Sequence, residues 1–332
     1  MKVTKDMIDP QLRLTGKLMD LMMRPNSLTE EKVRKQAEKP PLIMKIIEKM
    51  LPAPKGIQTE ERWIARSDGS MMRVLVRKPL EPKEGVPGVL HLHGGGYYGG
   101  NPDLVIHGPR YIEISDCVMV SPAYRRSVEA PYPAALEDCY TALLWLKENA
   151  AELGVRDDQL IVTGESAGGG LTAATTLYAR DKGEVNIAFQ MPIFPMIDDR
   201  NNSESAKDND APVWNEHTNE LGWKLYLGDL WGTDDVPAYA APARQTDFTG
   251  MPPTYTYVGA VDPFCSETID YIEKLKAAGV PAEIDVYEGG YHGFDLVKKA
   301  NVTKRAHERL AQWFETAVEE YTAPQPEAVE ES

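Results

Sequence analysis

Short apolar runs alternate with longer helical segments from about residue 60 of this 332-residue chain onward. Alternation of this kind is typical of strand–helix–strand units, which build a mostly parallel sheet covered by helices on both faces. The sequence therefore predicts the α/β fold class. The expected strands are residues 62–65, 71–77, 86–92, 118–121, 160–163, 187–190, 254–258 and 283–287. The expected helices are residues 133–149, 167–180, 267–278 and 302–321.

Two segments depart from this alternation. Residues 1–55 carry leucines at helical spacing and, after Pro40-Pro41, isoleucines at the same spacing, and these apolar faces need another surface to cover them. Residues 198–235 are rich in Asp and Asn and then in Trp and Tyr, which indicates a helical insertion over the sheet. We therefore divide the chain into a helical segment, two core parts, an insertion and a Pro- and Glu-rich tail expected to be disordered. The helical segment is 1–55, the two core parts are 56–197 and 236–322, the insertion between them is 198–235, and the tail is 323–332.

Charge and cysteine content exclude several classes of function. The net charge is −15, whereas nucleic-acid binders need clustered Lys and Arg facing the phosphates. Three cysteines without CxxC spacing give no disulfide framework and no zinc site. The first 20 residues lack the apolar core of a signal peptide, and no stretch is long enough to span a bilayer. We expect a cytoplasmic protein that binds neither nucleic acid nor a membrane.

A Gly-x-Ser-x-Gly motif, Gly164-Glu165-Ser166-Ala167-Gly168, directly follows the apolar run of residues 160–162. A strand that turns sharply into a helix at such a motif strains the backbone at the serine and exposes its hydroxyl. Glycines two residues before and after the serine leave room for a close approach of neighbouring backbone. We predict Ser166 as a nucleophile. The alternative is a plain glycine-rich connection between a strand and a helix.

Three glycines follow the expected strand at residues 86–92, within His93-Gly94-Gly95-Gly96-Tyr97. Glycines let backbone N–H groups turn toward a developing oxyanion without obstruction by side chains. The alternatives are a flexible loop, a phosphate-binding loop, or a metal site at His91 and His93. The run lacks the Gly-Lys-Ser/Thr ending of a P-loop, and the sequence identifies no third metal ligand nearby.

A histidine and an aspartate follow two late strands. His292 lies in a glycine-flanked loop after residues 283–287, where packing explains a histidine poorly, so we predict it as a general base. Asp262 follows residues 254–258 and begins a turn with a proline. An acid there would hold the imidazole tautomer, although Asp262 could instead cap the next helix. The order Ser, Asp, His is that of α/β-hydrolase triads.

Six motifs resemble, in residues and in spacing, those of the hormone-sensitive-lipase-like family of α/β hydrolases, also called bacterial esterase family IV. They span roughly residues 60–315. They are His93-Gly94-Gly95-Gly96-Tyr97, Pro122-Ala123-Tyr124-Arg125, Tyr132-Pro133-Ala134-Ala135-Leu136-Glu137-Asp138, Gly164-Glu165-Ser166-Ala167-Gly168-Gly169, Asp262-Pro263-Phe264 and His292-Gly293-Phe294. The resemblance implies an α/β-hydrolase fold with a helical cap built from residues 1–55 and 198–235.

The resemblance also implies an oxyanion hole made by the N–H groups of Gly95, Gly96 and Ala167. It makes His93 a structural support of the glycine loop rather than the base.

Three positions depart from the family pattern. Glu165 stands where Asp is commoner, Phe264 where Leu is usual, and Ser266 where a second Asp is frequent. These departures concern local contacts around the nucleophile and the acid, and they leave the triad assignment unchanged.

The sequence thus predicts a carboxylic ester hydrolase that forms an acyl-enzyme at Ser166 and needs no cofactor or metal. The cap implies small-molecule esters with short acyl chains, and the candidate pocket-lining residues are Tyr97, Tyr98 and Trp214. Two other functions stay open at this point. One is a non-catalytic receptor resembling the plant gibberellin receptors, which lack a working histidine, and the other is an amidase or peptidase. The resemblance also implies a homodimer formed through the edge of the last strand.

Overall fold

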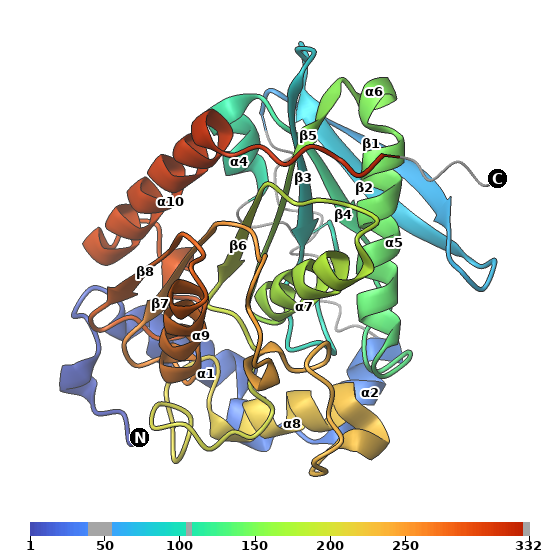
Figure 1. The fold of residues 1–332 in the computed structure, drawn as a ribbon. Helices are drawn as coiled ribbons and strands as arrows, with labels where there is room; N and C mark the ends of the chain where they lie inside the picture. Colours follow the sequence, from blue (N-terminus) through green and yellow to red (C-terminus); the bar gives the residue numbers. More distant parts are fainter. Residues whose placement is uncertain (39–54, 104–107, 328–332) are drawn as a thin grey trace.

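The computed structural model describes residues 1–38, 55–103 and 108–327. Within these ranges eight strands form one sheet in the order β1-β2-β4-β3-β5-β6-β7-β8 (Figure 1). The pairs β1–β2 and β2–β4 are antiparallel, and the other neighbouring pairs are parallel. The strands are β1 (Ile57–Ala65), β2 (Met71–Pro79), β3 (Val86–Leu92), β4 (Val118–Pro122), β5 (Val155–Glu165), β6 (Phe189–Ile193), β7 (Thr254–Gly259) and β8 (Ala282–Tyr287).

Helices cover both faces of the sheet and one of its ends (Figure 1). The helices are α1 (Arg13–Met23), α2 (Glu30–Glu38), α4 (Gly108–Ser115), α5 (Ala134–Glu148), α6 (Ala150–Leu153), α7 (Ala167–Lys182), α8 (Glu216–Leu227), α9 (Cys265–Ala277) and α10 (Asn301–Glu320). Side chains alternate along the central strands, as the period of a strand requires. Leu90 and Val162 join the core with α5 and α7, whereas Val89 and Ile161 join the core with α4 and α10.

The expected strands and helices are all present, with ends that differ by a few residues, so the prediction of an α/β fold is confirmed. Helix α4 was not expected. Its sequence, Gly-Pro-Arg-Tyr-Ile-Glu-Ile-Ser, begins with two poor helix formers and is only eight residues long. The burial of Tyr111 and Ile112 against the sheet stabilises the helix instead.

Helices α1, α2 and α8 lie together at one end of the sheet (Figure 1). The N-terminal segment and the insertion touch through polar and apolar contacts. The Asn215 side chain donates to the Asn26 amide oxygen at 2.8 Å, and Val33 is buried with Leu221 and Leu225. The two cap segments, whose contacting residues Asn26 and Asn215 are 189 positions apart in sequence, therefore form one layer.

Two expectations for the chain ends are wrong in part. The leucines of α1 are not covered: Leu14, Leu18 and Leu21 are 70%, 50% and 66% exposed, while the opposite face of α1 packs on the core at Gly16. The isoleucine-rich stretch of the same segment lies outside the described residues.

The tail expected to be disordered is ordered over residues 323–327. The N–H of Ala323 donates to the Asp158 carbonyl at 2.7 Å, and the Gln325 side chain accepts from the Asn186 N–H at 3.0 Å. Hydrogen bonds thus hold residues 323–327 against the core, although the composition of this segment predicts disorder. Residues 328–332 lie outside the described residues.

No helix among the described residues combines the length and the apolar content that a bilayer crossing requires.

A buried carboxylate fastens the β1–β2 hairpin to α5. The Asp138 side chain is 1% exposed and accepts from Arg66 Nε and Arg125 Nη2, each at 2.8 Å. Removing this carboxylate leaves Arg66 without its buried partner and Arg125 with only the exposed Glu137, so Asp138→Ala should lower the free energy of unfolding by about 3 kcal/mol. Urea unfolding followed by circular dichroism measures this change.

The neighbouring Glu137 provides a matched control, because its side chain is 49% exposed and lies 3.4 Å from Arg125. Glu137→Ala should cost less than about 1 kcal/mol. Equal losses for the two variants would contradict a special role for the buried carboxylate.

Candidate active site

The turn between β5 and α7 holds Ser166 in a strained conformation. Its φ of 59° and ψ of −120° lie where residues with a side chain rarely occur. Three backbone hydrogen bonds fix the turn: Ser166 N–H donates to the Ile193 carbonyl at 3.0 Å, and the Ser166 carbonyl accepts from Gly170 and Met196. The turn ends β5 at the carboxyl edge of the sheet, where ligand sites of α/β proteins form.

Glycine is required on both sides of this serine. A Cβ at Gly164 or Gly168 would collide with the carbonyl oxygen of Leu92, the last residue of β3. Since that oxygen belongs to backbone, it cannot move aside as a flexible side chain could. The motif therefore fixes how closely the nucleophile turn approaches the glycine loop that follows β3.

The structure brings Ser166, His292 and Asp262 into one chain of hydrogen bonds. Ser166 Oγ lies 2.9 Å from His292 Nε2, and His292 Nδ1 lies 2.8 Å from Asp262 Oδ2. A neutral imidazole that donates from Nδ1 to the carboxylate leaves Nε2 as the acceptor of the serine proton. The arrangement can take a proton from the hydroxyl and stabilise the resulting imidazolium.

Local contacts set the positions of the acid and the histidine. The N–H of Phe264 donates to Asp262 Oδ1 at 2.9 Å, which leaves Oδ2 for the imidazole. The Val261 N–H donates to the Gly290 carbonyl at 3.1 Å, so the acid loop and the histidine loop are joined. Because β7 and β8 are neighbouring parallel strands, the loops that follow them emerge side by side.

The glycine loop after β3 lies beside the serine. A Cβ on Gly94 would come within 3.4 Å of the Ser166 Cβ. Gly95 and Gly96 have φ values of 129° and 59°, and no hydrogen bond among the described residues uses their N–H groups. Ala167 is the first residue of α7, and the first N–H groups of a helix lack an intrahelical acceptor. These three amides can therefore serve an external oxyanion.

A model of the alpha/beta hydrolase fold family matches residues 89–296. The chain belongs to this family. Esterase LipI of Mycobacterium tuberculosis is 34% identical over 210 residues, which cover 63% of this chain and 65% of LipI. Carboxylesterase NlhH of the same organism is 31% identical over 244 residues, which cover 72% of this chain and 76% of NlhH.

The solved structure of Bacterial Heroin Esterase is similar over 95% of this chain and 99% of its own, with a TM-score of 0.84 and 31% identity. The expected resemblance to esterases of the α/β-hydrolase fold is confirmed, and the chain is an α/β hydrolase of the carboxylesterase type.

His91 and His93 do not converge on a common point in this α/β hydrolase. The His91 ring pairs with Glu165, whereas the His93 ring stacks on Tyr124 with ring centroids 4.1 Å apart. Burial lowers the pKa of the His93 imidazole to about 4, which keeps it neutral. The Tyr124 hydroxyl donates to the His93 carbonyl at 2.6 Å, so His93 is packed where it can support the glycine loop. Among the described residues, no group of three or more His, Cys, Asp or Glu side chains could hold a metal ion.

The three candidate pocket residues have different surroundings. Trp214 is 6% exposed, with its ring against Gly96 and its centroid 6.0 Å from that of His292. Tyr98 is half-buried and stacks on Trp214 at 6.2 Å. Tyr97 instead packs on Tyr226 at 3.9 Å, and its hydroxyl donates to the Met196 carbonyl at 2.7 Å. Tyr97 therefore packs beneath the cap, so of the three only Trp214 contacts a triad residue, and Tyr98 packs on Trp214.

Two aromatic neighbours of His292 were not predicted from the sequence. The rings of Phe194 and Phe264 meet the imidazole edge to face at centroid distances of 5.2 and 5.0 Å. Phe194 directly follows β6, and the ends of parallel strands meet at one edge of a sheet. The position of Phe194 after a strand was the one sequence signal for a place near the site. A single phenylalanine after a strand is too common, however, to identify a site.

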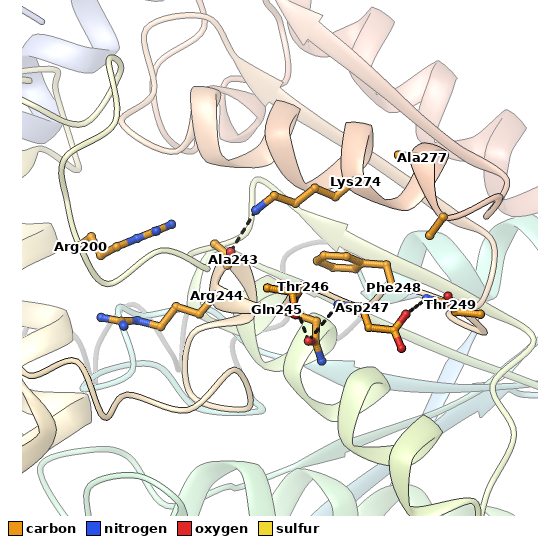
Figure 2. Close-up of a pocket in the computed structure, with 11 residues that line it drawn as sticks. Arg200, Ala243, Arg244, Gln245, Thr246, Asp247, Phe248, Thr249, Lys274 and Ala277 are labelled. Carbon is orange, nitrogen blue, oxygen red and sulfur yellow. Dashed lines mark hydrogen bonds between the residues drawn. The ribbon is translucent and has the colours of Figure 1, made fainter.

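A hollow of about 620 Å³ lies elsewhere, between α9 and residues 243–249. Figure 2 shows Lys274 beside Ala243, whose carbonyl accepts from the lysine ammonium at 3.1 Å. Arg200 and Arg244 also line it, and each is paired with an aspartate, Asp198 and Asp199 respectively. None of the triad residues lines this hollow, so the reactive site is located by side-chain geometry and not by cavity size.

Gly96 allows a direct test of the glycine loop. A Cβ at this position would collide with the Trp214 ring, and φ is 59°, so Gly96→Ala should displace the amides of the loop. Loss of one oxyanion donor lowers kcat by about 10²-fold to 10³-fold, and we expect a loss of this size in ester hydrolysis. Steady-state kinetics with p-nitrophenyl acetate measures it.

Gly99→Ala is the matched control, since the nearest atom to its Cβ would be the Gly95 carbonyl oxygen at 3.3 Å. Its kcat should fall far less than that of Gly96→Ala, because this contact requires a shift of only a few tenths of an ångström whereas the Gly96 Cβ would collide with a ring. If the Gly96→Ala enzyme is as active as the Gly99→Ala enzyme, the glycine loop has no role in the active site.

Proposed function

We propose that the chain hydrolyses short-chain carboxylic esters through a Ser166–His292–Asp262 triad and an acyl-enzyme intermediate. The observation that carries the proposal is the pair of contacts at 2.9 and 2.8 Å that link the serine hydroxyl, the imidazole and the carboxylate. The N–H groups of Gly95, Gly96 and Ala167, which make no hydrogen bond among the described residues, would stabilise the tetrahedral intermediate. The reaction itself requires no metal or cofactor.

The first half of the reaction forms the acyl-enzyme. Ser166 Oγ attacks the ester carbonyl while its proton passes to His292 Nε2, and the carbonyl oxygen becomes an oxyanion at the N–H groups of Gly95, Gly96 and Ala167. The carbon–oxygen bond to the alcohol then breaks, and the alcohol leaves with the proton from His292. Asp262 stabilises the imidazolium throughout.

Water completes the cycle. His292 takes a proton from water, whose oxygen attacks the acyl carbonyl in the same amide cradle. Collapse of the second tetrahedral intermediate breaks the bond to Ser166 Oγ, which regains its proton from the imidazolium. The products are a carboxylic acid and an alcohol, and the enzyme returns to its starting state.

Aromatic side chains around the triad support the short-chain preference. Trp214 lies over Gly96, and Ser166 and His292 are only 7% and 6% exposed. A substrate must place its carbonyl carbon about 3 Å from Ser166 Oγ, in a space bounded by Trp214, Phe194 and Phe264. Small acyl groups and small alcohols or phenols fit this constraint best.

The triad is tested by removing the nucleophile and the base. Ser166→Ala and His292→Ala should each lower kcat for p-nitrophenyl acetate by on the order of 10⁴-fold or more, and the double variant should be no worse than either single one. A fluorophosphonate probe should label the parent chain and not Ser166→Ala. Retention of activity in Ser166→Ala would exclude this nucleophile.

The same probe separates the proposal from a non-catalytic receptor, which would not be labelled at Ser166. Matched ester and amide substrates separate an esterase from an amidase, and we expect the ester to be hydrolysed faster.

Acyl-chain preference is tested with p-nitrophenyl esters from acetate to palmitate. We expect kcat/KM to be highest among the short chains and to fall toward palmitate, because Trp214 limits the depth available to the acyl group. Trp214→Ala should improve the longer esters relative to acetate. A maximum at palmitate for the parent enzyme would contradict the preference.

A further inference from the structure

His91 and Glu165 form a buried pair whose partners come from two neighbouring strands. His91 Nε2 lies 3.0 Å from Glu165 Oε1, and the two side chains are 1% and 11% exposed. His91 faces Thr163 in the β3–β5 register, and Glu165 is the last residue of β5. The contact therefore joins the carboxyl ends of these two strands.

The two strand ends carry different parts of the catalytic machinery. β3 is followed by the loop of Gly95 and Gly96, whereas β5 leads directly into Ser166. Their backbones touch, since a Cβ on Gly94 would lie 2.8 Å from the Glu165 carbonyl oxygen. The hydroxyl and the loop amides must act on one carbonyl group, so a shift between the strand ends separates them.

The surroundings of His91 determine which partner donates. Its Nδ1 is buried and has no hydrogen-bond partner among the described residues. A buried N–H without an acceptor is rarer than a buried acceptor without a donor, which favours an unprotonated Nδ1. The proton then lies on Nε2, and the His91 ring donates to Glu165 Oε1.

We propose that the His91–Glu165 hydrogen bond positions the oxyanion loop (the glycine loop of Gly95 and Gly96) against the nucleophile turn at Ser166 during ester hydrolysis. The inference rests on the proposed function, because it concerns the same hydroxyl and amides. The pair acts through geometry and does not touch the substrate. A carboxylate charge close to a developing oxyanion would oppose it, so the proposed role belongs to the hydrogen bond and not to a charge.

Three variants separate the hydrogen bond from the charge. Glu165→Gln keeps an oxygen acceptor and removes the charge. Glu165→Leu removes the acceptor at nearly constant size, and His91→Phe removes the donor and keeps a ring. The readouts are kcat and KM for p-nitrophenyl acetate, together with Ki for a trifluoromethyl ketone. This ketone adds to the serine and places an oxyanion in the amide cradle, so it reports transition-state binding.

We expect Glu165→Gln to keep kcat within about threefold of the parent value, since the acceptor is retained. In Glu165→Leu and His91→Phe, kcat should fall by about 10-fold to 100-fold, less than for loss of a donor, while KM changes little. The Ki of the ketone should rise by the factor by which kcat/KM falls. The double variant His91→Phe/Glu165→Leu should be no worse than either single variant, because the two residues act as one unit.

Tyr111→Phe is the matched control. The Tyr111 hydroxyl lies 3.0 Å from Thr163 Oγ1 in the same buried region, but this bond joins α4 to β5 and does not touch the oxyanion loop. The control should lose stability while kcat and Ki keep their parent values. A lowered kcat together with a raised Ki for Tyr111→Phe would show that any buried bond in this region has the same effect, and would overturn the proposal.

Two further results would also overturn it: an unchanged Ki in Glu165→Leu with a lowered kcat, or a Glu165→Gln enzyme as impaired as Glu165→Leu. If Glu165→Leu does not fold, Glu165→Asp withdraws the carboxylate by one methylene and should give a parallel but smaller change in kcat/KM and Ki. Ser166→Ala keeps the two questions apart. If it remains active the proposed function fails, and if it is inactive while Glu165→Leu is normal only the positioning role fails.

Discussion

The arrangement of the site depends on a backbone-to-backbone contact between the nucleophile turn and the end of β3. The Leu92 carbonyl lies where a side chain at Gly164 or Gly168 would have to be. This contact holds Ser166 in a conformation that costs of order 1–3 kcal/mol, and the hydrogen bonds of its N–H and carbonyl groups maintain it. The close approach of the two glycines to the end of β3 thereby places the Ser166 hydroxyl beside the glycine loop.

The histidine side of the site is held by a second set of close contacts. Gly259, at the end of β7, touches the backbone of Gly290, and Gly289 touches the backbone of Asp9 in the N-terminal segment. The Asp9 N–H donates to the Gly289 carbonyl at 3.1 Å, and the Tyr291 ring packs on Gly16 of α1. The N-terminal segment therefore supports the histidine loop as well as contributing to the cap, which explains why α1 packs with Gly16 inward and its leucines outward.

Much of this could be predicted from the sequence because the signals are local. Apolar runs predicted the strands, and the motif around Ser166, the loop around His292 and the turn at Asp262 each carry glycine or proline in a pattern that packing alone does not require. The remainder depends on tertiary contacts. The sequence around Tyr97 does not predict that its ring stacks on Tyr226, and the sequence of the tail does not predict that Gln325 bonds to Asn186. The pair His91–Glu165 joins residues 74 positions apart, and each has a plausible local explanation by itself.

The apolar surroundings of His292 make its carboxylate partner more important. The rings of Phe194, Phe264 and Trp214 surround the imidazole and limit its access to water. A charged imidazolium gains little hydration in such a place, so its formation in the reaction would be costly without a nearby anion. Asp262 supplies that anion at 2.8 Å, and its own second oxygen is already bound by a backbone N–H. In the proposed reaction, the same exclusion of water would strengthen the hydrogen bonds from the loop amides to the oxyanion, because charges interact more strongly at low dielectric constant. The proposed mechanism therefore links the three rings to the buried carboxylate: the rings would exclude water from the reaction, and the carboxylate would offset the cost of forming an imidazolium without water.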